Sequence, residues 1–163
     1  MKLKPSLAGL LAVTALLLTG CDYDAPLTPA PTHKIDARLL GDWVAVEKNA
    51  GDEVKDMRVR QWDDATYAIA IEDDVYRVWH SDFAGLPFVS AQDLNSADRK
   101  YCYYTWALSA DGTHLTLRRV RTEVIPEKTM PGTAIQQLIK ANLANPKLLD
   151  DPLVFTRMEP KQP

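Results

Sequence analysis

The chain has 163 residues, of which 46% are hydrophobic and 25% charged, and a formal net charge of −3. This length suits one domain large enough to bury a core of its own. Because no run of Lys and Arg stands out in the sequence, a nucleic-acid-binding protein is not expected.

The first 20 residues have the pattern of an export signal. Lys2 and Lys4 form a short basic start, and residues 7–18 form an apolar run. This run is shorter than the roughly 20 apolar residues that span a bilayer. The pattern therefore predicts a secretory signal peptide over residues 1–20.

The stretch "LLTGC", residues 17–21, resembles the lipobox of bacterial lipoproteins. The resemblance implies that Leu18, Thr19 and Gly20 are recognition positions, that the signal peptide is cut before Cys21, and that Cys21 carries the lipid. Two or three acyl chains give a stable anchor, whereas one binds a membrane only marginally. The alternative is an ordinary signal peptide with a cysteine nearby.

We therefore expect a protein of the bacterial cell envelope that faces the periplasm from its lipid anchor. Asp22 follows the cysteine, which in such lipoproteins favours the inner membrane over the outer. Residues 21–36 contain three prolines, which favour an extended spacer that holds the domain off the membrane. With Cys21 lipidated, Cys102 has no partner for an internal disulfide.

Residues 37–160 are expected to form one mainly β domain. Short alternating segments divided by turn signals predict a sandwich or barrel. The expected strands are 42–48, 57–62, 66–72, 75–81, 87–91, 100–109, 113–121 and 153–158. The stretch 131–146 carries Ile135, Leu138, Ile139 and Leu143 at helical spacing and predicts one helix before the last strand.

Three hairpins set the expected register. Asp111-Gly112 is a strong turn signal that places Tyr104 opposite Arg119. A turn at Asp73-Asp74 would place Tyr67 opposite His80. A loop over 63–65 is expected between the strands 57–62 and 66–72, because it alone puts Met57 and Val59 on the face of Ile71 and Ile69.

The stretch "LLGDWV", residues 39–44, resembles the Gly-x-Trp signature of lipocalins. The order of elements matches that family as well, although its Thr-Asp-Tyr signature is absent. The resemblance implies an antiparallel β-barrel of about eight strands with one helix before the last strand. It also implies that Gly41 and Trp43 lie at the closed end of the barrel, with Arg157 of the last strand against the tryptophan.

A candidate ligand-binding site lies at the polar end of the inner face, formed by Tyr67, His80, Tyr104 and Arg119. An eight-stranded barrel holds either packed side chains or one small ligand, and an arginine pairs well with an acidic head group. Alternatively, Arg119 stacks on Tyr104 and both reach solvent, since such side chains often extend outward from half-buried positions.

No metal site or cofactor is expected. The acidic pairs Asp63-Asp64, Asp73-Asp74 and Asp150-Asp151 fall at predicted turns, which aspartate favours. His80, Asp82 and Cys102 do not make a zinc set, because His114 is expected on an outer face and Cys102 as a small buried hydrophobe.

Three functions stay open. The first is non-catalytic binding of a small or amphipathic ligand inside the barrel. The second is an interaction module of the envelope with a fully packed barrel, suggested by Trp79 and Tyr103 on predicted outer faces, because aromatic residues are enriched at interfaces. The third is an enzyme, for which the sequence contains no recognisable catalytic motif.

Overall fold

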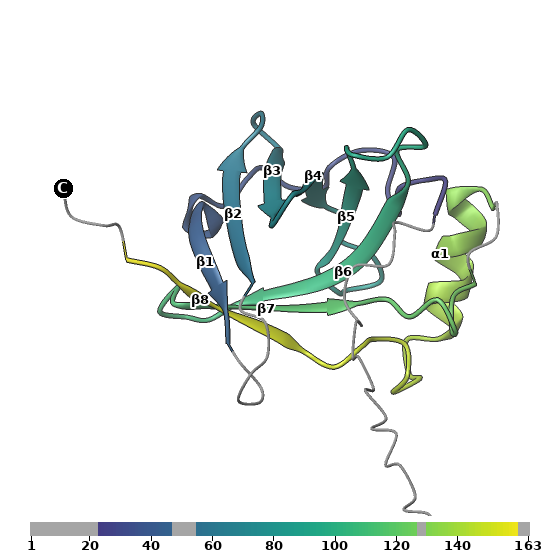
Figure 1. Cartoon of the computed structure of the whole chain (residues 1–163). Coiled ribbons are helices and arrows are strands. Elements are labelled where there is room, and N and C mark those ends of the chain that lie inside the picture. Colours follow the sequence, from purple (N-terminus) through teal and green to yellow (C-terminus); the bar gives the residue numbers. More distant parts are fainter. Residues whose placement is uncertain (1–22, 47–54, 127–129, 160–163) are drawn as a thin grey trace, which may run out of the picture.

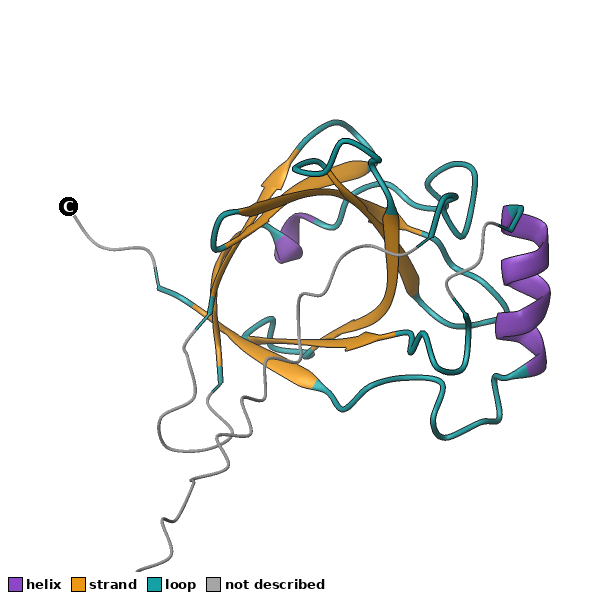
Figure 2. Cartoon of the chain, turned by 45° about the vertical axis from the view of Figure 1, so that its right-hand side comes forward, coloured by secondary structure: helices purple, strands orange, loops and turns teal. Residues whose placement is uncertain are grey.

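A computed structural model describes residues 23–46, 55–126 and 130–159, so the predicted signal peptide 1–20 and the predicted lipidation site Cys21 lie outside the described residues. Within those ranges, eight antiparallel strands form a closed barrel in the order β1 to β8, as expected from the sequence (Figure 1, Figure 2). The strands are β1 Gly41–Ala45, β2 Asp56–Gln61, β3 Thr66–Ile71, β4 Asp74–His80, β5 Phe88–Asp93, β6 Tyr101–Leu108, β7 His114–Arg119 and β8 Leu153–Arg157.

The barrel closes where β1 pairs with β8, with Trp43 opposite Arg157. Every strand therefore has two hydrogen-bonded neighbours, and the sheet has no open edge. The strands alternate in direction, so all starts of even-numbered strands and all ends of odd-numbered strands lie at one end of the barrel. We call this the open end, and the opposite one the closed end.

Two of the three expected registers are confirmed. Tyr104 pairs with Arg119 across β6 and β7, and Met57 pairs with Ile71 across β2 and β3. The β3–β4 hairpin turns earlier than expected, because Ile71 pairs with Asp74. Glu72 adopts the positive φ of 55° that a tight hairpin turn requires.

This shift changes the pairs but preserves the faces. Tyr67 lies opposite Val78 instead of His80. Because the partner moves by two residues and side chains alternate with a period of two, Tyr76 and Val78 still point into the barrel. The inner core contains Trp43, Met57, Val59, Tyr67, Ile69, Val78, Val89, Ala91, Trp106, Leu115 and Phe155.

A second core lies outside the barrel, where α1, Gly132–Ala141, packs beside the sheet (Figure 1). Ile135 and Ile139 of the expected apolar stripe are fully buried there, against Phe88 of β5 and Tyr103 of β6. The helix ends at Ala141, before the end of the stretch 131–146 that predicted it. In the part of the chain that the structure describes, no helix is both long and apolar enough to cross a membrane.

The segment after Cys21 packs against the domain, which corrects the expectation of a spacer that holds the domain off the membrane. Tyr23 forms an antiparallel bridge with Tyr101, through N···O distances of 3.1 and 2.8 Å. Leu27 is fully buried, and its backbone N–H donates to Ser90 Oγ at 3.1 Å. The backbone bends repeatedly over residues 24–33, and the buried Leu27 between the prolines has a partner on the sheet.

Candidate ligand-binding site

The closed end of the barrel is sealed by a short 3-10 helix, η1 Ala37–Leu39, which lies across the far end in Figure 2. Trp43 is fully buried beneath it and donates from Nε1 to the Leu39 carbonyl at 3.1 Å. The guanidinium carbon of Arg157 lies 4.3 Å from the centre of the Trp43 ring. Gly41 has a φ of +141°, and a Cβ there would lie 2.7 Å from Arg157 Nη1.

Tyr67 and His80 also lie toward the closed end, and each makes a hydrogen bond within the fold. The Tyr67 hydroxyl accepts from the backbone N–H of Asp36 at 2.6 Å. His80 Nε2 accepts from Trp106 Nε1 at 2.6 Å. Burial lowers the pKa of His80, which favours the neutral imidazole that this acceptor role needs.

The open end contains a cavity of about 70 Å³. One water needs about 10–15 Å³ of such space, so the cavity has room for several waters or a short apolar group. Most of its wall is apolar, formed by Met57, Ile69, Ile71, Val78, Val89, Ala91, Trp106, Leu117, Leu153 and Phe155. Lys55, Tyr76, Tyr104 and Arg119 complete the lining.

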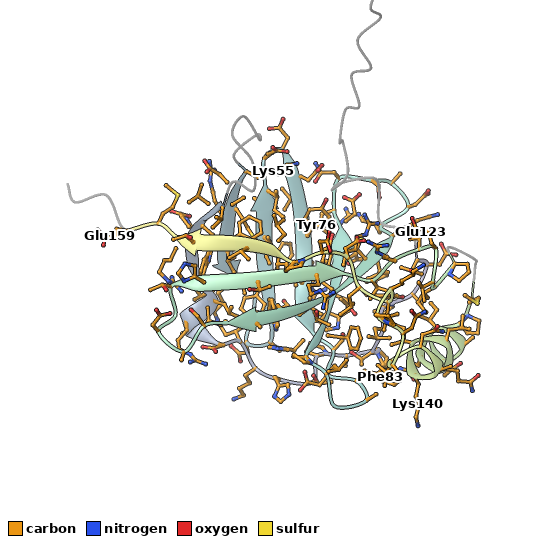
Figure 3. All side chains as sticks on the ribbon, turned by 90° about the horizontal axis from the view of Figure 1, so that it is seen from below. Lys55, Tyr76, Phe83, Glu123, Lys140 and Glu159 are labelled. Atoms are coloured by element: carbon orange, nitrogen blue, oxygen red, sulfur yellow. The ribbon has the colours of Figure 1, made fainter. Side chains whose placement is uncertain are left out.

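The polar lining residues come from four places around the open end. Lys55 immediately precedes β2, Tyr76 belongs to β4, and Tyr104 and Arg119 are paired across β6 and β7. Figure 3 shows Lys55 and Tyr76 far from Phe83, which lies in the β4–β5 loop at the closed end. An apolar chamber with cationic and phenolic groups at its mouth suits a ligand with an apolar tail and an anionic head.

The ammonium group of Lys55 is held only weakly by the protein and is available to bind an anionic ligand. Its Nζ lies 3.7 Å from Glu72 Oε2, which is longer than a hydrogen bond. The Lys55 side chain is only 22% exposed, whereas Glu72 is 40% exposed. Such a loose, partly solvated ion pair contributes little stability, so an anionic ligand could replace it at small cost.

The structure thus divides the four residues predicted for the site. Tyr104 and Arg119 line the cavity, whereas Tyr67 and His80 are absent from its wall. The sequence reasoning missed Lys55 and Tyr76 as site residues. The two-residue period of a strand could have identified both, because Lys55 shares a face with Met57 and Tyr76 shares a face with Val78.

The aromatic residues expected on outer faces are not exposed. Trp79 is 6% exposed and lies edge-on to Tyr101, with ring centres 5.8 Å apart. Tyr103 is fully buried and stacks on Tyr23 at 4.4 Å. The hypothesis of an interaction surface formed by Trp79 and Tyr103 is therefore wrong.

The acidic pair at 63–64 has a structural role in its turn. Asp63 Oδ1 accepts from the backbone N–H groups of Ala65 and Thr66, at 2.9 Å each. These hydrogen bonds lower the pKa of Asp63 because they favour the charged carboxylate. Among the described residues, no group of three or more His, Cys, Asp or Glu side chains is placed to hold a metal ion.

Comparison with known proteins adds no functional assignment to this geometry. No family model, no curated protein and no solved structure matches the chain.

Proposed function

We propose that the protein is a lipid-anchored protein of the bacterial envelope that binds a small amphipathic ligand, non-catalytically, in the open end of its barrel. The observation that carries this proposal is the apolar cavity with Lys55 and Arg119 at its mouth. The lipobox resemblance at Cys21 supports the anchor, and the Gly41, Trp43 and Arg157 arrangement supports a lipocalin-like barrel.

The ligand best suited to this site has a single short acyl chain and a carboxylate or phosphate head. The apolar wall favours the chain by about 0.8 kcal/mol for each buried CH₂ group. A charge-assisted hydrogen bond to Arg119 is worth about 1.5–3 kcal/mol, which is roughly a tenfold to hundredfold difference in affinity. The head group should therefore decide selectivity.

An interaction module with a packed barrel is the alternative, and it has less support. The interior is not fully packed, and Trp79 and Tyr103, which suggested such a surface, are buried.

The test uses Trp106, because this tryptophan lines the cavity. The full-length lipidated protein in lipid nanodiscs is titrated with 6-bromohexanoate, whose bromine quenches nearby tryptophan fluorescence, and with the neutral 6-bromohexanol. We expect saturable quenching by both, with at least tenfold tighter binding of the acid. Arg119→Gln should reduce that preference, and the remainder should be lost when Lys55→Gln is added.

Two alanine variants provide the matched control. Ala91→Leu adds bulk inside the cavity and should abolish saturable quenching, whereas Ala107→Leu adds the same bulk on the exposed face of β6 and should not. If Ala91→Leu titrates like the unchanged protein, the ligand does not occupy the cavity and the proposal fails.

The anchor is tested separately with Cys21→Ala. This change should retain the signal peptide and abolish the lipid-dependent fractionation of the processed protein with membranes. Unchanged processing would show that Cys21 is not the modified residue.

A further inference from the structure

The residues closest to the proposed anchor are attached at the open end of the barrel. Tyr23 bridges to Tyr101, the first residue of β6. Its hydroxyl donates to the Ile125 carbonyl at 2.7 Å, and its side chain is 1% exposed. Along the same strand, Tyr104 lines the cavity three residues further on. Tyr23 thus occupies the edge of β6 that continues beyond its pairing with β7.

The attachment extends over residues 23–28, which we call the N-terminal segment. The Tyr103 hydroxyl donates to the Ala25 carbonyl, and Gln136 Nε2 of α1 donates to the Leu27 carbonyl at 2.7 Å. Thr28 Oγ1 donates to Ser81 Oγ at 2.8 Å. The N-terminal segment buries both Tyr23 and Leu27. Burial of one large apolar side chain stabilises the folded state by about 1.5–3 kcal/mol. The attached state of the segment should therefore predominate.

The distance from the anchor to this attachment is short. Cys21 precedes Tyr23 by two residues, which span at most about 7 Å. A strand of six residues such as β2 is about 20 Å long. A lipid on Cys21 therefore lies near the open end and about a strand length from the closed end.

From this geometry we propose that the N-terminal segment turns the cavity mouth toward the anchoring membrane, so that the amphipathic ligand enters from the lipid surface. This inference rests on the anchor and the cavity of the proposed function. It adds a source for the ligand, namely a single-chain lipid of the leaflet that holds the anchor. A ligand dissolved in the periplasm would gain nothing from this orientation.

Surface charge at the open end does not account for such an orientation. Lys55 and Arg119 are accompanied there by acidic side chains that include Asp56, Glu72 and Asp74. Attraction to an anionic membrane and repulsion from it should therefore largely cancel. The covalent position of the anchor is the stronger constraint.

The test compares two apolar residues of equal exposure at opposite ends. Val75 at the start of β4 is 36% exposed, and Leu86 in the β4–β5 loop is 37% exposed. Val75→Cys and Leu86→Cys are introduced separately into the full-length protein and labelled with a small fluorophore. Cys102 should not react in the folded protein because it is buried. The lipidated proteins are reconstituted in phosphatidylethanolamine–phosphatidylglycerol vesicles that contain a nitroxide head-group lipid.

We expect the label at residue 75 to be quenched at least threefold more strongly than the label at residue 86. A ten-residue Gly-Ser insertion between Asp22 and Tyr23 leaves the contacts of the N-terminal segment intact but lengthens the connection to the anchor. This insertion should remove most of the difference. Equal quenching without the insertion, or a difference that survives it, would overturn the inference.

These outcomes are separable from those of the proposed function. Absence of protein from the vesicles after processing indicates failure of the anchor. Saturable Trp106 quenching by 6-bromohexanoate together with equal quenching at residues 75 and 86 refutes the orientation and leaves ligand binding in place.

Discussion

Arg157 of the last strand lies over the ring of Trp43 in the first strand, with its guanidinium carbon 4.3 Å from the ring centre. The same guanidinium donates from Nη1 to the Leu40 carbonyl at 2.8 Å and from Nε to the Gly112 carbonyl at 3.0 Å. One side chain thus connects the two strands whose pairing closes the barrel. It also connects them to the C-terminal end of η1 and to the β6–β7 turn.

Arg157→Ala should lower the free energy of unfolding by about 2–4 kcal/mol, because it removes a cation–π contact and leaves carbonyl groups unpaired. Arg157→Lys keeps the charge but cannot reproduce the planar set of donors, so its loss should be intermediate. Urea denaturation followed by tryptophan fluorescence measures both. Arg60→Ala serves as the control, since Arg60 pairs with Asp42 while more than half exposed, and should change the stability by less than about 1 kcal/mol.

Gly41→Ala should destabilise the protein by about 1–3 kcal/mol for two separate reasons. Its φ of +141° is unfavourable for a residue with a Cβ, and that Cβ would lie 2.7 Å from Arg157 Nη1. In an Arg157→Ala background the steric part disappears, so the loss caused by Gly41→Ala should be smaller there. Strictly additive losses in the double variant would show that the two residues do not act on each other.

Tyr23→Ala should cost about 3–5 kcal/mol, because it removes a fully buried aromatic side chain. Tyr23→Phe keeps the stacking on Tyr103 and loses only the hydrogen bond to Ile125, so about 1 kcal/mol is expected. Urea denaturation of the lipidated protein in detergent measures both losses. A negligible effect of Tyr23→Ala would show that the N-terminal segment is not part of the folded unit.

The stability should decrease on acidification in a way that depends on His80. Burial holds the pKa of His80 below the value of 6.5 expected for an exposed histidine. The unfolded chain therefore binds the proton more readily than the folded one. The stability linked to His80 is complete above about pH 6.5 and is lost as the pH falls through the lower pKa of the folded state.

The measurement compares denaturation midpoints at pH 7.5 and pH 5.5. His80→Gln keeps a hydrogen-bond acceptor for Trp106 and removes the titration, so its midpoint should fall less between these pH values than that of the unchanged protein. If both midpoints fall equally, other groups cause the acid sensitivity.

Counting the reactive thiols tests whether a lipid is attached to the sulfur of Cys21. Cys102 is buried and should react with an aromatic disulfide reagent only after denaturation. The mature denatured protein should show one reactive thiol if the sulfur of Cys21 carries lipid, and two if it is free. The variant Cys102→Ser should show no reactive thiol if the sulfur of Cys21 carries lipid and one if it is free, which assigns each signal to its residue.

The barrel could be predicted from the sequence because the signals for its strands and turns are local. Asp111-Gly112 fixes its hairpin, with Gly112 at a φ of +73°, and the alternating strands then define the inner face. The β3–β4 turn could not be placed in the same way, because Glu72, Asp73 and Asp74 are consecutive acidic residues and any adjacent pair suits a turn. The packing of the hairpin selects Glu72 for the left-handed position.

The site was predictable only in part for a related reason. Alternation placed Tyr104 and Arg119 on the inner face, but it could not show which end of the barrel η1 would seal. The N-terminal segment was least predictable. Its prolines are a local signal for extended backbone, whereas the partners that bury it lie 102 residues away for Tyr23 and 78 residues away for Ala25. Such separations leave no periodic pattern in the segment itself.

Closure of the barrel by Arg157 also has a consequence for the order of folding. Its hydrogen bond to Leu40 joins residues 117 positions apart, so the first strand must wait for nearly the whole chain to become available before β8 can pair with it. Until then β1 and β7 are both unpaired edges that can recruit strands of other molecules. Folding dominated by such distant pairings takes milliseconds to seconds. A chain truncated before Leu153 would keep those edges permanently, and we expect it to aggregate or be degraded instead of accumulating as a folded protein.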